Sequence, residues 1–198
     1  MSNRSRVPLV AGMLAAMTAA AVLRWVIGHP LTVHTQAMAP TVQQGETVWV
    51  AQRSARLGDV VQVDLGGGYG LYRVVATGGQ RVDIENRALF VDGVRTDASQ
   101  ASTVRIMGQA CEAVDVPVVR ANLEGHDFGF VPGGEDVSVT VPPSMVYLLG
   151  DNRGAAGDSR TWGAVPVTAL EGVATRVLWS WAPCISRVRW RRIWNSIE

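Results

Sequence analysis

The chain has 198 residues, 47% of them apolar and 18% charged, which is enough for one globular domain with a short accessory segment but not for two full domains. Its formal net charge of +1 excludes the basic excess that a nucleic-acid-binding surface normally shows. All 18 basic residues are arginine, so the chain has no lysine, and any mechanism that needs a neutral lysine amine is excluded.

The first element is an apolar run from Val7 to Leu23 that contains no charged residue. As a helix rising about 1.5 Å per residue it spans roughly 25 Å, and four further residues bring it to the ~30 Å of a hydrocarbon core. Two arginines precede the run, and by the positive-inside rule they place the N-terminus in the cytoplasm. The sequence therefore predicts a cytoplasmic tip and transmembrane anchor over residues 1–28, and an extracytoplasmic domain over residues 29–198.

A cleaved signal peptide is the alternative interpretation of this segment. Ala19, Ala20 and Ala21 could supply a small-residue cleavage site after the apolar run. We favour the anchor, because the run exceeds the ~7 to 15 apolar residues of a usual signal peptide. The sequence leaves open whether the segment is trimmed.

After Gly28 the chain turns to short valine-rich runs separated by Gly, Pro and Asp, a pattern typical of strands. The dipeptide Asp92-Gly93 predicts a tight hairpin turn. The glycine-rich stretch 64–71 predicts a second hairpin rather than a nucleotide site, because no helix start follows it. A more polar segment, about 96–135, is interpreted as an insertion. We expect a mainly β domain with strands at 45–52, 58–65, 71–77, 80–86, 88–94 and 138–150.

Two cysteines, Cys111 and Cys184, have no metal-ligand spacing and are too few for a disulfide scaffold. A compartment outside the cytoplasm would permit a bond between them. Their separation along the chain does not show whether their Cα atoms come close enough, so the sequence leaves the pairing open.

Four segments carry short motifs: QAMAPTVQQGETVWV at 36–50, RLGDVVQV at 56–63, LYRVVATGGQRV at 71–82 and LLGDNRGAAGDSRTWGAVP at 148–166. In this order they resemble the boxes of bacterial type I signal peptidase, the Ser/Lys-dyad enzyme that removes signal peptides from exported proteins. The resemblance implies a signal-peptidase-like β-barrel or complex β fold with one N-terminal transmembrane helix, in the bacterial inner membrane with the main domain in the periplasm. It also implies exported proteins and membrane lipid as partners, and no metal, small-molecule cofactor or nucleic acid.

The positions of that family's catalytic groups hold other residues in this chain. The serine nucleophile falls on Ala37, the lysine base on Tyr72, and the serine that orients the lysine on Ala156. Arginine does not replace the base, because its pKa above ~12 keeps it protonated. Tyr72 could accept a proton only as a phenolate, which burial disfavours. The sequence therefore predicts a catalytically inactive member.

Thr35 is the strongest candidate for a displaced nucleophile. It lies two residues before Ala37, about 6.6 Å away along an extended strand, whereas attack needs ~3 to 3.5 Å. The resemblance gives Thr35 a different role, lining the oxyanion hole, and groups it with Met38 and Pro40 as substrate-binding residues.

Histidine could also serve as a base, since eukaryotic relatives of the family carry one at the lysine position, which here is Tyr72. On an extended strand His34 should point away from Thr35. His29 lies at the expected membrane exit and His126 in the insertion. We expect all three histidines to be ordinary surface residues.

Polar residues of the last two boxes are retained, and we expect them to form a structural hydrogen-bond network: Arg73, Asp151, Asn152, Arg153, Asp158, Ser159, Arg160 and Gly163. Because a domain drifting without selection could have lost these too, we favour a retained binding role. The hypothesis is that the protein holds an extended segment of an exported protein, a signal peptide or a pilin-like subunit, by β-strand addition without cleaving it. An active endopeptidase with a non-standard centre and a degenerate copy without a role are the alternatives.

The C-terminal tail is rich in tryptophan and arginine between Trp179 and Trp194. Such a segment is typical of contact with anionic lipid headgroups. It is equally compatible with a capping strand followed by a solvated end, and the sequence favours neither.

Overall fold

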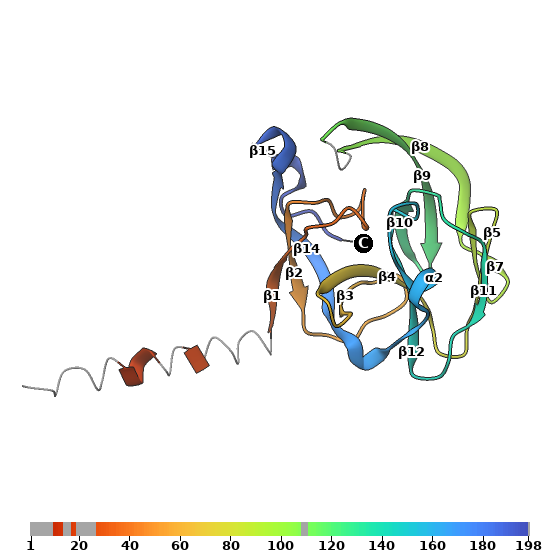
Figure 1. Ribbon diagram of the computed structural model, residues 1–198, viewed down its shortest axis with the longest axis horizontal. Helices are drawn as coiled ribbons and strands as arrows, with labels where there is room; N and C mark the ends of the chain where they lie inside the picture. Colours follow the sequence, from red (N-terminus) through yellow and green to blue (C-terminus); the bar gives the residue numbers. More distant parts are fainter. Residues whose placement is uncertain (1–9, 14–16, 19–26, 108–110, 198) are drawn as a thin grey trace, which may run out of the picture.

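The computed structural model describes residues 10–13, 17, 18, 27–107 and 111–197, and it shows a mainly β protein with three sheets (Figure 1). The large sheet has eight strands in the order β1-β2-β14-β3-β4-β12-β13, with β15 paired to β14. These strands are β1 (Gly28–Thr32), β2 (Glu46–Ala51), β3 (Val60–Asp64), β4 (Tyr69–Thr77), β12 (Met145–Leu149), β13 (Val165–Pro166), β14 (Leu170–Ala182) and β15 (Arg187–Val188).

Two smaller sheets and several short helices complete the described part of the fold. The four-stranded sheet has the order β11-β5-β6-β7 and the three-stranded sheet the order β10-β9-β8. The interpreted insertion, 96–135, therefore contains a sheet of its own. The bounds are β5 (Arg81–Glu85), β6 (Ala88–Val91), β7 (Val94–Arg95), β8 (Asp97–Met107), β9 (Ala113–Leu123), β10 (His126–Phe130), β11 (Val137–Thr140), α2 (Ser159–Trp162), η2 (Val167–Ala169), η3 (Pro183–Ile185) and η4 (Trp190–Arg192).

Both expected hairpin turns are confirmed. Asp92 and Gly93 have φ angles of 51° and 77° and join Val91 to Val94, which pair across β6 and β7. Positive φ at both central residues matches the right-handed twist of the flanking strands, which is why Asp-Gly is favoured there. The glycine-rich stretch likewise turns over residues 65–68, between the ends of β3 and β4.

The expected single strand at 138–150 is wrong. The chain forms β11 and β12 there, which join different sheets: β11 pairs with β5 and β12 pairs with β4. Pro142 and Pro143 interrupt the run because proline has no N–H for a sheet ladder, and Ser144 follows with a φ of 61°. The valine content therefore indicated strand correctly but concealed the break.

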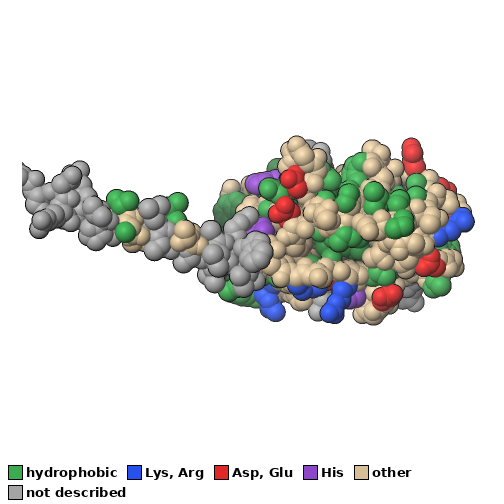
Figure 2. Space-filling model, turned by 90° about the horizontal axis from the view of Figure 1, so that it is seen from below, with side chains coloured by type: hydrophobic (Ala, Val, Ile, Leu, Met, Phe, Trp, Pro, Cys, Tyr) green, Lys and Arg blue, Asp and Glu red, His purple; other side chains and the backbone are tan. Residues whose placement is uncertain are grey.

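The expected membrane segment lies largely outside the described residues. Its described parts, residues 10–13 and 17–18, are helical, and exposed apolar side chains lie along them (Figure 2). Among the described residues, no helix has the length and apolar character needed to cross a bilayer.

The central strands of the large sheet are buried on both faces. Val60 packs in one apolar cluster together with Met38 and Leu71, whereas its neighbour Val61 packs in a second cluster together with Tyr72. Successive side chains of a strand point to opposite faces, so β3 and β4 separate the two clusters. This arrangement fixes the strand that carries Tyr72 in the middle of the domain.

The C-terminal tail lies along β14 and does not run free into solvent. Trp194 N donates to Val177 O (2.7 Å) and Ile197 N donates to Thr175 O (3.0 Å). Ile197 is buried in the same cluster as Met38. The tail thus closes the side of the large sheet that supports the loop after β1.

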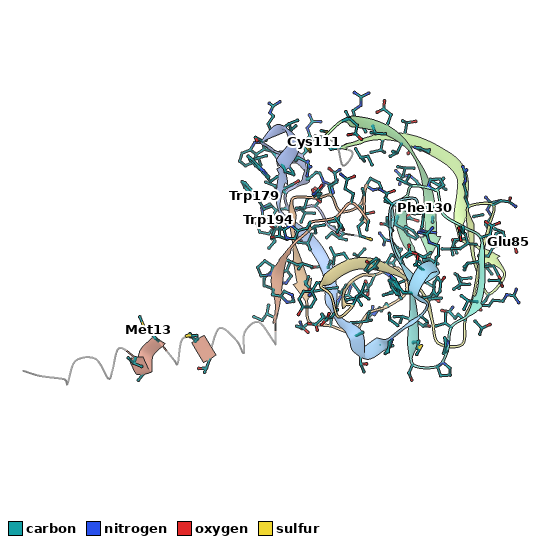
Figure 3. All side chains as sticks on the ribbon, in the orientation of Figure 1. Met13, Glu85, Cys111, Phe130, Trp179 and Trp194 are labelled. Carbon is teal, nitrogen blue, oxygen red and sulfur yellow. A yellow bond between two sulfur atoms is a disulfide. The ribbon has the colours of Figure 1, made fainter. Side chains whose placement is uncertain are left out.

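Cys111 and Cys184 form a disulfide, with their Cα atoms 5.2 Å apart. Cys111 lies between β8 and β9, two residues before β9 begins, and Cys184 lies in η3 after β14. The bond ties the tip of the three-stranded sheet to the C-terminal tail, and the labelled Cys111 lies at the top of the view in Figure 3.

Candidate functional site

The loop between β1 and β2 carries Ala37 and is fixed at its base. Val33 N donates to Glu46 O (2.8 Å), and Gly45 N donates to Val33 O (2.8 Å). These two bonds close the loop where the strands end. Ala37 itself is half-buried, so the loop presents its methyl group from a held backbone.

Met38 and Pro40, expected to bind substrate, belong to the supporting side of this loop. Met38 is 1% exposed and packs in the core cluster of the large sheet. Its carbonyl accepts a hydrogen bond from Val42 N (2.9 Å). Pro40 follows a cis peptide bond and is half-buried. Met38 thus supports the loop from the core, and neither Met38 nor Pro40 is among the residues that line the groove described below.

Ala37 and Ala156 converge on Gly150, the residue that follows β12. Asn152 fastens the loop to this point, because its backbone N–H donates to Ala37 O (2.9 Å) and its Nδ2 donates to Gln36 O (3.2 Å). A Cβ on Gly150 would lie 2.3 Å from Ala156 Cβ and 2.6 Å from Ala37 O. No larger residue fits between these groups, so glycine is required at position 150.

Tyr72 and Arg73 enter the site from β4. Arg73 pairs with Leu149 of β12, directly before Gly150, and Tyr72 pairs with Val61 of β3. The Tyr72 ring packs edge to face against Trp162, with ring centroids 5.6 Å apart. Burial, and then the nearby Asp158 carboxylate, raise the pKa of the Tyr72 phenol above its ordinary value. Tyr72 is therefore a neutral hydroxyl at physiological pH.

A groove of about 700 Å³ runs past these residues. It joins the loop after β1, the turn between β3 and β4 and the segment after Asn152. No charged side chain lines it within the described residues. The lining consists of His34, Thr35, Gln36, Ala37, Gln44, Leu65, Gly67, Gly68, Tyr69, Gly70, Tyr72, Ala155 and Gly157.

The segment around Thr35 is not a strand, since β1 ends at Thr32. Thr35 and His34 are both exposed and both line the groove, so the expectation that they lie on opposite faces is wrong. An irregular backbone does not impose the alternation of a strand. No hydrogen bond links the Thr35 hydroxyl to the His34 ring in the described part of the chain.

The other histidines differ from each other in placement. His29 is 5% exposed, and its Nε2 lies 2.9 Å from Gln62 Oε1; the expectation of a surface residue is wrong, because β1 turns this side chain toward the interior of the large sheet. His126 is half-buried in β10, where Gly58 leaves room for it. Neither residue lines the groove.

Behind the groove, Arg73 and Asp151 form a buried ion pair. Arg73 donates to Asp151 from Nε (2.9 Å) and from Nη2 (2.7 Å), and Nη1 donates to Gly58 O (2.6 Å). Both side chains are at most 1% exposed. Thr41 donates its hydroxyl to Asp151 Oδ2 (2.5 Å), and the Arg73 guanidinium lies 4.2 Å from the centre of the Phe128 ring.

A second buried centre forms around Asp158. Its carboxylate accepts from Gly150 N (3.0 Å) and from Arg160 Nε (2.7 Å). Arg160 also donates to Arg153 O (2.6 Å), and Ser159 Oγ accepts from Leu148 N (3.0 Å). The residues expected to form the network are thus linked to one another around Gly150. Gly163 ends α2, with its N–H donating to Ser159 O (2.9 Å).

Arg153 is buried over the Phe130 ring, 4.5 Å from its centre, and donates from Nε to Gly150 O (3.0 Å). Burial lowers the pKa of its guanidinium to about 10. Even so, the group remains a cation at neutral pH and is no candidate for a general base.

Several contributors to the site were not identified from the sequence. Thr41 lies in the first motif, next to the predicted site residues Met38 and Pro40. This position in the sequence could have identified it as a site residue. Gln36, Gln44 and Tyr69 also line the groove, but two amide side chains in a loop and a tyrosine at the start of β4 carry no such signal. Glu46 is fully buried and accepts hydrogen bonds from Ser180 Oγ (2.7 Å) and from Arg192; its partners are too distant in sequence to be paired by inspection.

The chemistry available in the groove is therefore hydrogen bonding and apolar contact. Ala37 offers a methyl group and Tyr72 a protonated phenol, whereas Ala156 packs beside Gly150, next to the lining residues Ala155 and Gly157. Within the described residues there is no group of three or more His, Cys, Asp or Glu side chains that could hold a metal ion.

Comparison with known proteins gives one consistent result. A family model described as "Signal peptidase, peptidase S26" matches residues 6–179. A protein from Synechocystis sp. named "Probable signal peptidase I-1" is 26% identical over 187 residues, covering 86% of this chain and 80% of that protein. "Signal peptidase I" of Bacillus caldolyticus is 26% identical over 164 residues, covering 79% of this chain and 82% of that protein.

A solved structure was also found. The crystal structure of a signal peptidase I from Enterococcus faecalis V583 aligns with a TM-score of 0.42 at 22% identity, covering 62% of this chain and 98% of that chain.

Proposed function

The chain belongs to the type I signal peptidase family, peptidase S26, and we propose that this member binds an extended segment of exported proteins in its groove without cutting it. The observation that carries the proposal is the groove itself. No charged side chain lines it in the described part of the chain, and Ala37 and Tyr72 stand in its lining where the family places serine and lysine. Ala156, at the position of the family's second serine, lies next to the lining residues Ala155 and Gly157. The segment it holds belongs to a signal peptide or to a pilin-like subunit.

The absence of cleavage follows from what proton transfer requires. A serine nucleophile must lose its proton to a neighbouring neutral base. At position 37 there is no hydroxyl to attack, and the Tyr72 phenol has a pKa raised by burial, so it is protonated and cannot accept. With no lysine in the chain, an amine base is also missing.

Binding of an extended segment needs unpaired backbone groups and room beside them. In the described part of the chain, the backbone N–H and C=O groups of His34 and Thr35 make no hydrogen bond, and both residues line the groove. A peptide laid along them can add as a strand, with main-chain hydrogen bonds supplying affinity and side-chain pockets supplying selectivity. The neutral lining favours the uncharged, small-residue segments at which signal peptides end.

The proposed location is the bacterial inner membrane, with the main domain in the periplasm. The support is the uncharged run from Val7 to Leu23 and the two arginines before it. An anchor there holds the groove beside exported proteins as they emerge. Lipid is thus a partner through the first segment.

The peptide-binding proposal is tested with a fluorescent signal-peptide segment and the full-length protein in detergent, read by anisotropy. Gly67→Trp should weaken binding at least about tenfold, because Gly67 lines the groove and a Cβ there meets no atom within 4 Å. Gly154→Trp is the matched control, since Gly154 has the same free space but does not line the groove. Equal affinity for the wild type and Gly67→Trp would refute the groove as the site.

The rival function is an active endopeptidase that uses Thr35, favoured by the placement of Thr35 and His34 on the same groove. A preprotein cleavage assay on the purified protein separates the two. We expect no product over background. Turnover that disappears in both Thr35→Ala and His34→Ala, with peptide binding retained, would establish the rival.

A further inference from the structure

The hairpin of β8 and β9 carries an apolar row on one of its two faces. Two cross-strand pairs form it, Val104 with Val116 and Ile106 with Val114. Residues directly opposite on antiparallel strands share a face, so these four side chains lie together and are called here the hairpin row. The side chains of the other face are all exposed: Thr103, Arg105, Asp115 and Pro117.

The hairpin row is packed at one end and open along its middle. Ile106, nearest the tip, is 6% exposed and borders a small space together with the loop between β1 and β2 and the tail after β14. Val104, Val114 and Val116 are only half-buried. Among the described residues, the three apolar clusters of the core include none of these valines. The middle of the row therefore presents branched apolar side chains that the core does not cover.

The hairpin is fastened to the rest of the domain on both sides of this open stretch. At the tip, the disulfide of Cys111 joins it to η3. Toward the base, Val118 is buried and packs on Gly129 of β10, where a Cβ would lie 2.8 Å from a Val118 methyl carbon. Between these attachments the hairpin curves over the loop between β1 and β2 (Figure 1). Because Ile106 contacts this loop region, the row faces inward.

The hairpin row continues from the peptide groove. Gln36 and Gln44 line the groove, and both also border the small space beside Ile106 and Met107. The two amides contact each other, with Gln36 Nε2 donating to Gln44 Oε1 (3.5 Å). A chain that lies in the groove and passes this amide pair therefore reaches the tip of the hairpin row.

We propose that the exported segment held in the groove continues under the hairpin and packs apolar side chains on the hairpin row. The inference rests on the proposed function and deepens it, because it specifies the segment. An extended chain turns every second side chain to the same face, so the part under the hairpin carries apolar residues at alternate positions. Charged residues are excluded from that face, since burial against valine would desolvate them without a partner.

The test compares fluorescent peptides on the full-length protein in detergent, read by anisotropy. A short signal-peptide segment is extended at its N-terminal or its C-terminal end by eight residues that alternate Val and Ser. The same extensions made of Gly and Ser are the peptide controls. We expect one of the two Val/Ser extensions to bind at least about tenfold more tightly than its Gly/Ser counterpart, because it buries apolar surface on the row.

Val104→Asp should abolish this gain and leave the affinity for the short segment unchanged, because it places a charge in the row. Thr103→Asp is the matched control, since it adds the same charge at the neighbouring position of β8 on the exposed face. Val104→Thr keeps the shape of valine and adds only a hydroxyl, so it should reduce the gain by about threefold. This milder variant serves as the test if Val104→Asp does not fold.

A gain that is lost in Val104→Asp and kept in Thr103→Asp supports the proposal. Equal affinity of the short segment and both Val/Ser extensions overturns it and leaves the groove as a binding site. Loss of the gain in both aspartate variants also overturns it, because added charge and not the row would then set the affinity. A dimer that Val104→Asp dissociates, without any gain from the extensions, would show that a second copy covers the row. Wild-type protein that binds no peptide refutes the groove and the row together.

Discussion

The two sides of the site differ in what they contain. On the groove side, Ala37 and Tyr72 provide a methyl group and a neutral phenol, and Ala156 adds a second methyl group beside Gly150. On the buried side, Arg73 and Asp151 make a bidentate ion pair at full burial, and Asp158 fixes Gly150 from the other direction. The difference teaches that the architecture of the groove depends on groups that take no part in proton transfer. The proposed binding without cleavage requires this separation between the groups that support the groove and the groups that would transfer protons.

The strongest test of this difference between the two sides puts the family's catalytic residues back into the groove. Ala37→Ser, Tyr72→Lys and Ala156→Ser together should give preprotein cleavage on the order of 10²–10⁴-fold above background, the range that a positioned general base supplies. Tyr72 is 9% exposed among apolar residues, so a lysine there would have its pKa lowered by desolvation. Product formation is followed by gel and mass spectrometry.

Ala37→Ser alone is the control for this prediction. It supplies the hydroxyl without the base and should remain inactive. A folded triple variant that binds peptide and still shows no turnover would mean that the groove has also lost the geometry for attack.

Removing a member of the buried network should lower the free energy of unfolding. Asp151→Ala leaves the Arg73 guanidinium buried without its counter-ion, and removing one partner of a buried pair typically costs about 3–5 kcal/mol. Urea denaturation of the variant measures the change in the free energy of unfolding. Asp115→Ala provides the contrast, because its partner Arg105 is 71% exposed and such surface pairs are worth about 0–1 kcal/mol. Similar losses in the two variants would contradict the structural role of the network.

Removing the disulfide should have a smaller effect. It acts on the loop between β1 and β2 through the contact of this loop with η3. Cys111→Ser with Cys184→Ser removes a cross-link spanning 73 residues of sequence, and such bonds typically stabilise by about 2–4 kcal/mol. Gln36 and Gln44 line the groove and also the contact between the loop and η3, so peptide affinity should fall as well. Thermal unfolding and anisotropy measure the two effects, and the single variant Cys111→Ser serves to exclude disulfide exchange. Loss of stability with unchanged affinity would uncouple the bond from the groove.

Tyr72→Phe should have the smallest effect. If the hydroxyl donates one hydrogen bond to a bound peptide, its removal costs about 0.5–1.5 kcal/mol, or up to roughly tenfold in affinity. The pKa of Tyr72 is raised above about 10, so the donor is fully protonated below that value and is lost only as the pH rises through the raised pKa. Affinity should therefore be constant between pH 6 and 9, and the wild-type minus Tyr72→Phe absorbance titration should have its midpoint above 10. A change in affinity near neutral pH that survives in Tyr72→Phe would show that the Tyr72 proton is not its cause.

Much of the fold was predictable because strands leave a local signature. The runs at 45–52 and 58–65 contain β2 and β3 of the large sheet, and the run at 71–77 lies within β4. Asp92-Gly93 makes the predicted turn. The family expected from the four motifs is confirmed by the match over residues 6–179. The break inside 138–150 was missed because valine density outweighed two prolines that remove ladder donors.

Other features depend on contacts between distant segments and carry no local signature. His29 is buried only because β1 lies on β2 with this side chain turned inward. Glu46 meets Arg192 across 146 positions, and Cys111 meets Cys184 across 73. The membrane segment, largely outside the described residues, stays a prediction.

By itself the amino-acid sequence determined the mainly β class, the family and the identity of the side chains at positions 37, 72 and 156, because these depend on residue type and on short-range order. Only the tertiary structure decided that Ala37 and Ala156 meet at Gly150 and that His34 and Thr35 share one groove. Residue types set which chemistry is available, but chain packing over long sequence distances sets which groups come within bonding reach of one another.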